Sequence, residues 1–257
     1  MNIPTRIREA PIDLSVFPFR DLVPRDFAAN MEYRERLLAV KGADARRNLW
    51  IMCKRDIVFW LGSWAWLIEP RVGTDKPTII PFIPYPFQEE FFAVMLECLD
   101  RGKPMCCVKT RGMGLTWMMA AIDVWLLQFH SNRSMGVMSR VEDLVDKTGN
   151  PDTIMGKMDV LMEKQPAWMR CSLETNKLHR KNLENGSVVD GSSTTANSFR
   201  GGRRFTLFVD EHAHIGDSEA LHGALNQVSN CRVYGSTPNG TGNMFHKTSE
   251  NPAWEQL

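Results

Sequence analysis

The feature that most constrains this 257-residue chain is a short glycine-bearing segment at residues 108–116, VKTRGMGLT. An apolar run precedes it at residues 105–108, and an apolar run with helical character follows at residues 117–129. A strand, a glycine-bearing turn and a helix in this order form the context of a phosphate-binding loop. In such a loop the backbone N–H groups and the helix dipole both favour a polyanion. The segment therefore predicts a phosphate site at the start of the helix.

The segment departs from the usual phosphate-loop pattern, G-x-x-x-x-G-K-[ST]. Gly114 and Thr116 fit this pattern. Leu115, however, occupies the position of the lysine, and Lys109 occupies the position of the first glycine. Either Lys109 has taken over the role of the missing lysine or the site is inactive.

A working loop would use three kinds of group. The N–H groups of residues 112–116 would hold phosphates, and the Thr116 hydroxyl would reach Mg²⁺. Lys109 or Arg111 would supply positive charge toward the β- and γ-phosphates. The alternative is a plain glycine turn in an unrelated α/β fold, and the loop by itself does not decide between the two.

The composition is that of a globular chain, with 43% hydrophobic and 24% charged residues. The 31 basic and 30 acidic side chains nearly cancel, so the total charge does not indicate a nucleic-acid binder, although a local basic face is compatible with it. Six scattered cysteines have no zinc-site spacing and are interpreted as reduced thiols. The most apolar stretch, residues 57–68, is shorter than the roughly 20 residues of a membrane span and predicts a buried helix.

The remaining pattern predicts an α/β fold with a mostly parallel central sheet flanked by helices. Helices are expected at residues 25–40 and 43–68, an edge strand or extended segment at 78–83, and a helix that starts at Pro86 and is closed by Gly102. Strand-like runs then alternate with helical stretches, the strands near 105–108, 135–139, 205–210 and 232–236 and the helices near 114–129, 141–146, 153–164 and 218–228. Asn185-Gly186 predicts a hairpin within residues 179–190.

A second chemical feature is the strand-like run FTLFVDE at residues 205–211, which ends in Asp210 and Glu211. Ligand sites of α/β folds lie at the carboxyl ends of strands. Asp210 is therefore a candidate for holding Mg²⁺, and Glu211 is a candidate base that orients the attacking water. An acidic turn after a strand is the alternative, but the combination with an upstream phosphate loop favours the functional interpretation.

Two further loops carry polar groups. The strand at residues 232–236 ends in Ser236, Thr237 and Pro238, which could sense a γ-phosphate, although a solvated turn fits equally well. The basic loop SFRGGRR at residues 198–204 is compatible with an arginine finger, with contacts to DNA phosphates or with a solvated run of charge.

Taken together, these motifs resemble the ATPase domain of the large terminase subunit of tailed double-stranded DNA bacteriophages. The resemblance spans roughly residues 85–245 and rests on the order and spacing of several motifs. It implies a P-loop NTPase of the RecA/ASCE-like kind at residues 71–257. Residues 1–70 would form an N-terminal extended and helical segment that acts as a lid or a docking subdomain.

The resemblance also implies roles for individual residues. Some members of the family carry the lysine at the start of the loop, which matches Lys109, and the loop arginine of the family matches Arg111. The Arg-Gly pair upstream of the acidic strand matches Arg200-Gly201, whose arginine would act as a finger on the ATP of the neighbouring subunit. The implied ATP-binding residues are Phe87, Gln88, Lys109, Thr110, Arg111, Gly112, Met113, Gly114, Leu115 and Thr116. The implied catalytic residues are Glu211, Arg200 and Arg111, the metal ligands are Thr116 and Asp210, and the coupling motif is Ser236, Thr237 and Pro238.

The function implied by the resemblance is Mg²⁺-dependent ATP hydrolysis that drives double-stranded viral DNA into a procapsid. The implied partners are double-stranded DNA, the portal ring of the procapsid and the small terminase subunit. The chain would form a homo-oligomeric ring when assembled and a monomer in isolation, in the cytoplasm of the infected bacterial host. No membrane contact is expected. The nuclease half of the family has no counterpart in these 257 residues, so DNA cleavage is not expected of this piece.

Two other functions remain open. One is another P-loop nucleic-acid motor such as a helicase, although no second loop-and-acid pair follows in the sequence. The other is a nucleotide-binding module that has lost turnover, of which Leu115 would be the sign. The basic run KLHRK at residues 177–181 is a weak candidate for DNA contact, and a solvated face is the favoured interpretation.

Overall fold

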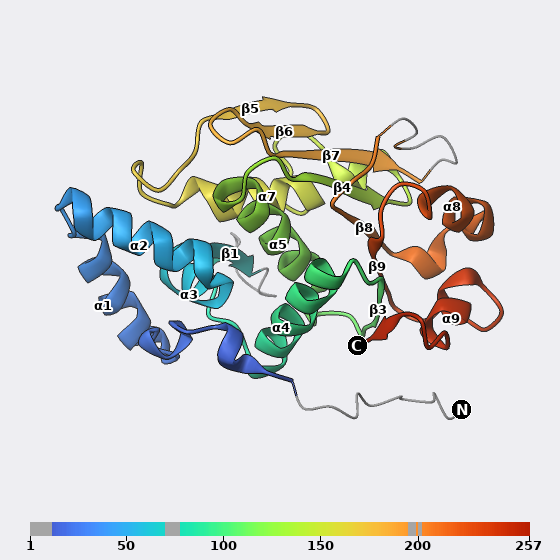
Figure 1. Ribbon diagram of the computed structural model, residues 1–257, viewed down its shortest axis with the longest axis horizontal. Coiled ribbons are helices and arrows are strands. Elements are labelled where there is room, and N and C mark those ends of the chain that lie inside the picture. Colours follow the sequence, from blue (N-terminus) through green and yellow to red (C-terminus); the bar gives the residue numbers. More distant parts are fainter. Residues whose placement is uncertain (1–11, 70–77, 195–198, 200–201) are drawn as a thin grey trace.

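A sheet of mostly parallel strands forms the centre of the protein (Figure 1). The structure is a computed structural model, and it describes residues 12–69, 78–194, 199 and 202–257. Within these residues the sheet has eight strands in the order β10-β3-β9-β8-β4-β7-β6-β5. All neighbours from β10 to β7 pair in parallel, whereas β6 pairs antiparallel with both β7 and β5. The strands are β3 Met105–Val108, β4 Ser134–Ser139, β5 Leu173–Asn176, β6 His179–Asn182, β7 Val188–Ser193, β8 Thr206–Asp210, β9 Cys231–Ser236 and β10 Glu255–Gln256.

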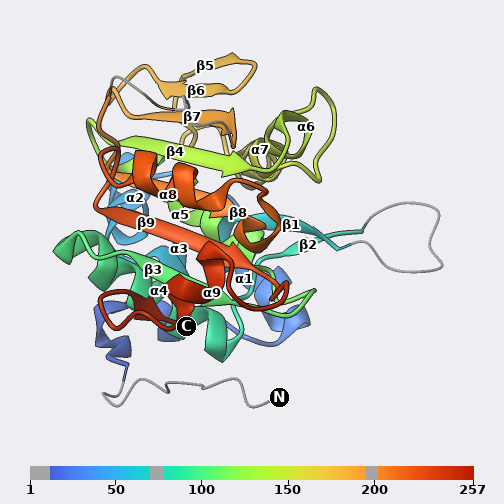
Figure 2. The ribbon, with the colours of Figure 1, turned by 90° about the vertical axis from the view of Figure 1, so that its right-hand side faces the viewer.

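Helices cover both faces of this sheet (Figures 1 and 2). The larger core joins one face to α3 Ile57–Trp64, α4 Pro86–Arg101, α5 Leu115–Phe129 and α7 Ile154–Glu163. The smaller core joins the other face to α8 Ser218–Leu225 and α9 Met244–Ser249. Successive strand residues alternate between the cores: Phe208 lies in the larger one, while Leu207 and Val209 lie in the smaller. The predicted α/β fold with a parallel sheet between helices is confirmed.

The N-terminal part differs from the prediction. A single helix was expected at residues 43–68, but α2 Ala43–Arg55 ends before Asp56 and α3 begins directly after it. Asp56 has an extended backbone, and its carboxylate accepts hydrogen bonds from Phe59 N and Phe19 N, both at 2.8 Å. A side chain that caps a new helix in this way satisfies N–H groups that a continuous helix would otherwise use, so the helix breaks here.

The end of the same segment is a strand. Residues 66–69 form β1 Trp66–Glu69, which pairs antiparallel with β2 Thr78–Pro81. The helical prediction for residues 65–68 is therefore wrong, because pairing with a partner that lies later in the chain overrides local propensity. The prediction of burial is correct for residues 57–65, which are all buried, whereas residues 66–68 are only partly buried. The helix α1 Phe27–Leu38 agrees with the prediction.

Several later elements match the prediction, and a few were not predicted. The expected hairpin is β6–β7, and α6 Glu142–Val145 lies where a helix was expected. The strands β5 and β10 and the helix α9 were not predicted. No helix among the described residues is long and apolar enough to cross a membrane.

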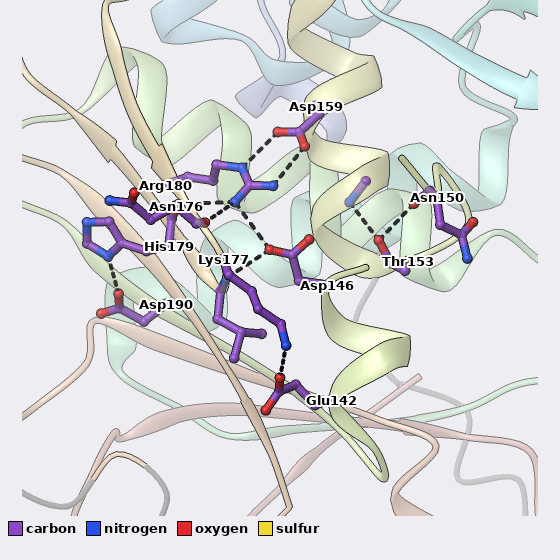
Figure 3. Close-up of polar contacts among 12 residues, drawn as sticks. Glu142, Asp146, Asn150, Thr153, Asp159, Asn176, Lys177, His179, Arg180 and Asp190 are labelled. Carbon is purple, nitrogen blue, oxygen red and sulfur yellow. Dashed lines mark hydrogen bonds and ion pairs between the residues drawn. The ribbon is translucent and has the colours of Figure 1, made fainter. Parts of the chain in front are cut away.

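The basic run at residues 177–181 belongs partly to the interior (Figure 3). Arg180 is 4% exposed, and its guanidinium donates to both oxygens of Asp159 on α7 at 2.9 and 2.8 Å. It also contacts Asp146 at 3.3 Å, whereas Lys177 lies at the surface and pairs with Glu142. The interpretation of the whole run as a solvated face is therefore wrong for Arg180. Arg180 therefore connects β6 to α7.

One buried acid has no partner. Asp123 lies in the middle of α5 with no exposed surface, and neither carboxylate oxygen has a hydrogen-bond partner among the described residues. Burial raises the pKa of Asp123 well above its ordinary value. The residue is therefore protonated in the folded protein over a pH range in which it ionises in the unfolded chain.

This difference predicts that Asp123 lowers the free energy of unfolding by an amount that depends on pH, and that Asp123→Asn removes this effect. Below about pH 4 the carboxyl is protonated in both states. As the pH rises above that value, only the unfolded chain ionises, so the free energy of unfolding falls by about 1.4 kcal/mol per pH unit until the raised folded pKa is reached. In urea denaturation at about pH 4.5 and about pH 6.5, the stability of Asp123→Asn relative to the natural protein should therefore be greater at the higher pH.

The matched control is Asp100→Asn, an exposed position on α4, which should show no comparable trend. Parallel stability curves for Asp123→Asn and the natural protein across this pH range would contradict the assignment.

Candidate functional site

The phosphate-loop segment connects β3 to α5 at the carboxyl edge of the sheet. Gly112 and Gly114 have φ values of 83° and 79°, in the left-handed region that favours glycine. A side chain at Gly114 would also lie 3.1 Å from Gln88 Nε2. Gly114 caps the start of α5, so the first N–H groups of this helix face the loop. The strand, turn and helix predicted around this segment are all present.

The order of the strands brings the predicted acidic residues to the same edge of the sheet as the loop. The strand β9 lies between β3 and β8, and Lys109 N continues the β3–β9 pairing by donating to Ser236 O at 3.1 Å. Asp210 is the last residue of β8 and is 8% exposed. Because all three strands run in parallel, their carboxyl ends meet at one place.

Lys109 faces both acids. Its Nζ atom is 3.5 Å from Asp210 Oδ1 and 3.4 Å from Glu211 Oε1, and its side chain is 14% exposed. Thr116 Oγ1 donates to Asp210 Oδ2 at 2.9 Å. The structure thus brings together four of the predicted site residues, two from the loop and two that follow them by 94 to 102 positions in the sequence.

Leu115 faces the interior and not the loop. It is 3% exposed, and a Cβ atom on Gly235 of β9 would lie only 2.4 Å from its Cδ2 atom. The position that holds lysine in the usual pattern is therefore a core position here. Only the backbone N–H of Leu115 is available to a phosphate.

The other loop residues are open to solvent. Thr110, Arg111, Gly112 and Met113 are all exposed. The guanidinium of Arg111 therefore has the freedom to approach a bound phosphate.

Gln88 contacts the loop, and two exposed aromatic residues lie next to it in the sequence. Gln88 is 7% exposed, its Oε1 accepts from Tyr85 N at 3.1 Å, and its Nε2 is 3.5 Å from Met113 O. The rings of Tyr85 and Phe87 stack with centroids 5.9 Å apart and planes 7° apart. They are 65% and 40% exposed as residues. Sequence reasoning identified Phe87 and Gln88 but missed Tyr85, although the spacing of the two aromatic residues in Y-P-F-Q was available as a signal.

The segment after β9 is tied to the turn after Glu211. Ser236 Oγ accepts from Ala213 N at 3.1 Å, and Asn239 Nδ2 donates to Ala213 O at 3.2 Å. Thr237 Oγ1 is 3.2 Å from His214 Nε2, and Pro238 is exposed in the following loop. The predicted coupling motif therefore contacts the chain next to the predicted base. His214 was not singled out from the sequence.

Two of the predicted residues cannot be placed. Arg200 and Gly201 lie outside the described residues. In the same basic loop, Arg204 NH1 donates to Ser134 Oγ at 2.6 Å and to Asp190 Oδ2 at 2.5 Å. Arg204 is thus occupied by internal contacts, which makes it a poor candidate for binding DNA.

The oxygens of Thr116 and Asp210 suit a magnesium ion. Mg²⁺ is commonly bound through one or two carboxylates together with phosphates and waters, so a site with few protein ligands is normal. No group of three or more His, Cys, Asp or Glu side chains with metal-site geometry exists among the described residues. A metal that also uses a phosphate oxygen fits this arrangement, whereas a fully protein-ligated metal does not.

Comparison with known proteins finds no matching family model and no matching curated protein. Among solved structures, the HK97 bacteriophage large terminase is similar with a TM-score of 0.50 and 13% identity, over 71% of this chain and 37% of that chain. The chain shares its fold with this large terminase. The predicted α/β fold with a mostly parallel central sheet is therefore confirmed, and the resemblance seen in the sequence holds at the level of fold.

Two other structures give lower scores. A mutant of the large terminase ATPase domain of Thermus phage P74-26 has a TM-score of 0.47 and 17% identity, over 64% of this chain and 79% of that chain. The SWI2/SNF2 ATPase core of Sulfolobus solfataricus in complex with double-stranded DNA has a TM-score of 0.42 and 11% identity, over 60% of this chain and 32% of that chain.

The packing of Leu115 predicts that restoring the usual lysine harms the protein. Leu115→Lys would place an ammonium group without a partner against Gly235, so the free energy of unfolding should fall by about 3 kcal/mol or more. Leu115→Met keeps the volume and should cost less than about 1.5 kcal/mol. Urea denaturation of both variants checks this. Equal stability of Leu115→Lys and the natural protein would mean that the position still opens toward the loop.

Proposed function

We propose that this chain is the ATPase domain of a motor that packages double-stranded DNA into a viral procapsid. The observation that carries the proposal is the meeting of Lys109 and Thr116 with Asp210 and Glu211 at one edge of the sheet. A loop that holds phosphates, a metal-binding acid and a second acid beside it are the parts that phosphoryl transfer to water requires.

The nucleotide would bind along the loop. The N–H groups of residues 112–116 and the start of α5 would face its phosphates, with Lys109 and Arg111 neutralising their charge. The adenine ring would lie against the exposed aromatic surface of Tyr85 and Phe87, with Gln88 beside it.

Hydrolysis would depend on the two acids at the end of β8. Thr116 and Asp210 would hold Mg²⁺, which when bound neutralises charge on the β- and γ-phosphates. Glu211 is 32% exposed at its side chain, so a water molecule can reach its carboxylate. This carboxylate would orient the water and accept its proton.

Coupling would pass through the segment after β9. Ser236, Thr237 and Pro238 would respond to loss of the γ-phosphate, since this segment is bonded to the turn that carries Glu211. Arg200 would complete the charge on the transition state in the ATP site of a neighbouring subunit, which requires a homo-oligomeric ring. DNA would be held through its phosphates, without preference for sequence and with strong dependence on salt.

The wider setting follows from the same proposal. The portal ring of a procapsid and the small terminase subunit are the proposed partners, and the cytoplasm of an infected bacterium is the proposed location. The N-terminal segment, residues 1–70, is the proposed lid or docking surface. A general P-loop nucleic-acid motor and a nucleotide-binding module without turnover are the competing functions.

The test separates binding from hydrolysis. Glu211→Gln should keep affinity for ATP and lose about 10²-fold or more in rate, because the base is gone. Lys109→Ala should weaken ATP binding about 10- to 100-fold, because a charged contact to phosphate is lost. Binding is measured by calorimetry with Mg²⁺ and ATP, and hydrolysis by phosphate release in a concentrated preparation with and without duplex DNA.

The controls are exposed residues of the same type, Glu90→Gln and Lys41→Ala, which should change neither quantity. Tight ATP binding without hydrolysis under every condition would favour the module without turnover. Full affinity and activity in Lys109→Ala would contradict the role given to this lysine.

The role of Arg200 across subunits has a separate test. Arg200→Ala and Glu211→Gln should each be nearly inactive alone, because an arginine finger contributes about 10³- to 10⁵-fold in rate. A mixture should regain activity, since an intact Glu211 site can receive an intact Arg200 from its neighbour. Absence of recovery in mixed rings that are shown to form would contradict action across subunits.

A further inference from the structure

A histidine outside the predicted motifs contacts both the proposed base and the proposed coupling motif. His214 Nε2 is 3.6 Å from Glu211 Oε2 and 3.2 Å from Thr237 Oγ1. We infer that His214 is a positioning residue, which holds the carboxylate of Glu211 and links it to Thr237. The inference rests on the proposed function and adds a residue to it.

The backbone explains how His214 reaches the base. Glu211 adopts a left-handed conformation with φ 55° and ψ 37°, which is uncommon for a residue other than glycine. The chain then forms a short 3₁₀ turn at residues 212–214, and His214 N donates to Glu211 O at 2.9 Å. This turn folds the chain back, so the imidazole lies beside the carboxylate that precedes it by three positions.

The turn is fixed from the neighbouring strand. Ala213 donates its N–H to Ser236 Oγ and accepts from Asn239 Nδ2 through its carbonyl oxygen. These two bonds flank the contact between His214 and Thr237. A shift of the segment after β9 would therefore move the imidazole, and with it the carboxylate.

The charges around Glu211 give His214 a specific task. One carboxylate oxygen faces Lys109 at 3.4 Å and the other faces His214. Once phosphates are bound, Lys109 must share its charge with them, so its hold on Glu211 weakens. His214 is attached to the 3₁₀ turn and not to the phosphate loop, so it remains to keep the carboxylate in place for the attacking water.

The test is kinetic. His214→Ala should lower kcat for ATP hydrolysis about tenfold or more while KM for ATP changes less than about twofold, because the base is misplaced and binding is not. His214→Gln should recover part of the rate, since its amide can place an N–H group near the carboxylate. Combining His214→Ala with Thr237→Val should cost no more than His214→Ala alone.

The chain offers a closely matched control. The side chain of His246 on α9 has the same 34% exposure, and its Nε2 atom lies 3.5 Å from Glu250 Oε1. His246→Ala should leave kcat unchanged. A His214→Ala variant with the kcat of the natural protein, or an equal loss in His246→Ala, would overturn the inference without affecting the proposed ATPase function.

A second measurement does not depend on turnover. The imidazole ¹⁵N resonances of His214 should shift in Glu211→Gln and in Thr237→Val, because both contacts reach the same nitrogen. Unchanged resonances in both variants would overturn the inference. If the natural protein hydrolyses no ATP, the proposed function fails, and the resonances still decide whether His214 makes these contacts.

Discussion

The site depends on one constraint of parallel sheets, which is that neighbouring strands end at the same edge. The strands β3, β9 and β8 are adjacent and parallel, so the loop after β3 and the acids at the end of β8 lie within reach of one side chain. Lys109 makes that contact with its Nζ atom between two carboxylates. If β9 were not inserted between the other two strands, its last residue Ser236 and the following Thr237 would not lie beside the turn after Glu211.

The same constraint explains the irregular loop. Leu115 begins a helix that is buried along almost its whole length against the sheet, and it packs on Gly235 of the neighbouring strand. An ammonium group at this position would lose contact with water without gaining a partner. The lysine that reaches the two acids is Lys109, which directly follows β3. The packing of Leu115 thus accounts for the irregular loop, and the role of the usual lysine is the one that we propose for Lys109.

Much of the fold could be predicted because its signals are local. Strand-like apolar runs alternating with helices indicated the parallel sheet, and glycines at positions 112 and 114 indicated a turn, in which the structure gives both residues a left-handed backbone. The predictions that failed concern residues whose structure depends on partners far away in the sequence. Residues 66–69 became a strand because of a partner at residues 78–81, and Arg180 is buried because Asp146 and Asp159 meet it from other elements. A basic run in a sequence looks the same whether its partners are water or carboxylates.

The sequence by itself determined which groups are available: a glycine loop with Lys109 and Thr116, an apolar strand that ends in two acids, and their order along the chain. Their chemistry follows from residue type, so it could be read without coordinates. Only the tertiary structure decided which groups meet. The contact of His214 with Glu211 and Thr237 depends on a left-handed residue and on the position of β9, and neither is encoded in the spacing of these residues. The order of the strands in the sheet sets these contacts. That order results from packing across the whole chain, so it cannot be deduced from the spacing of these residues alone.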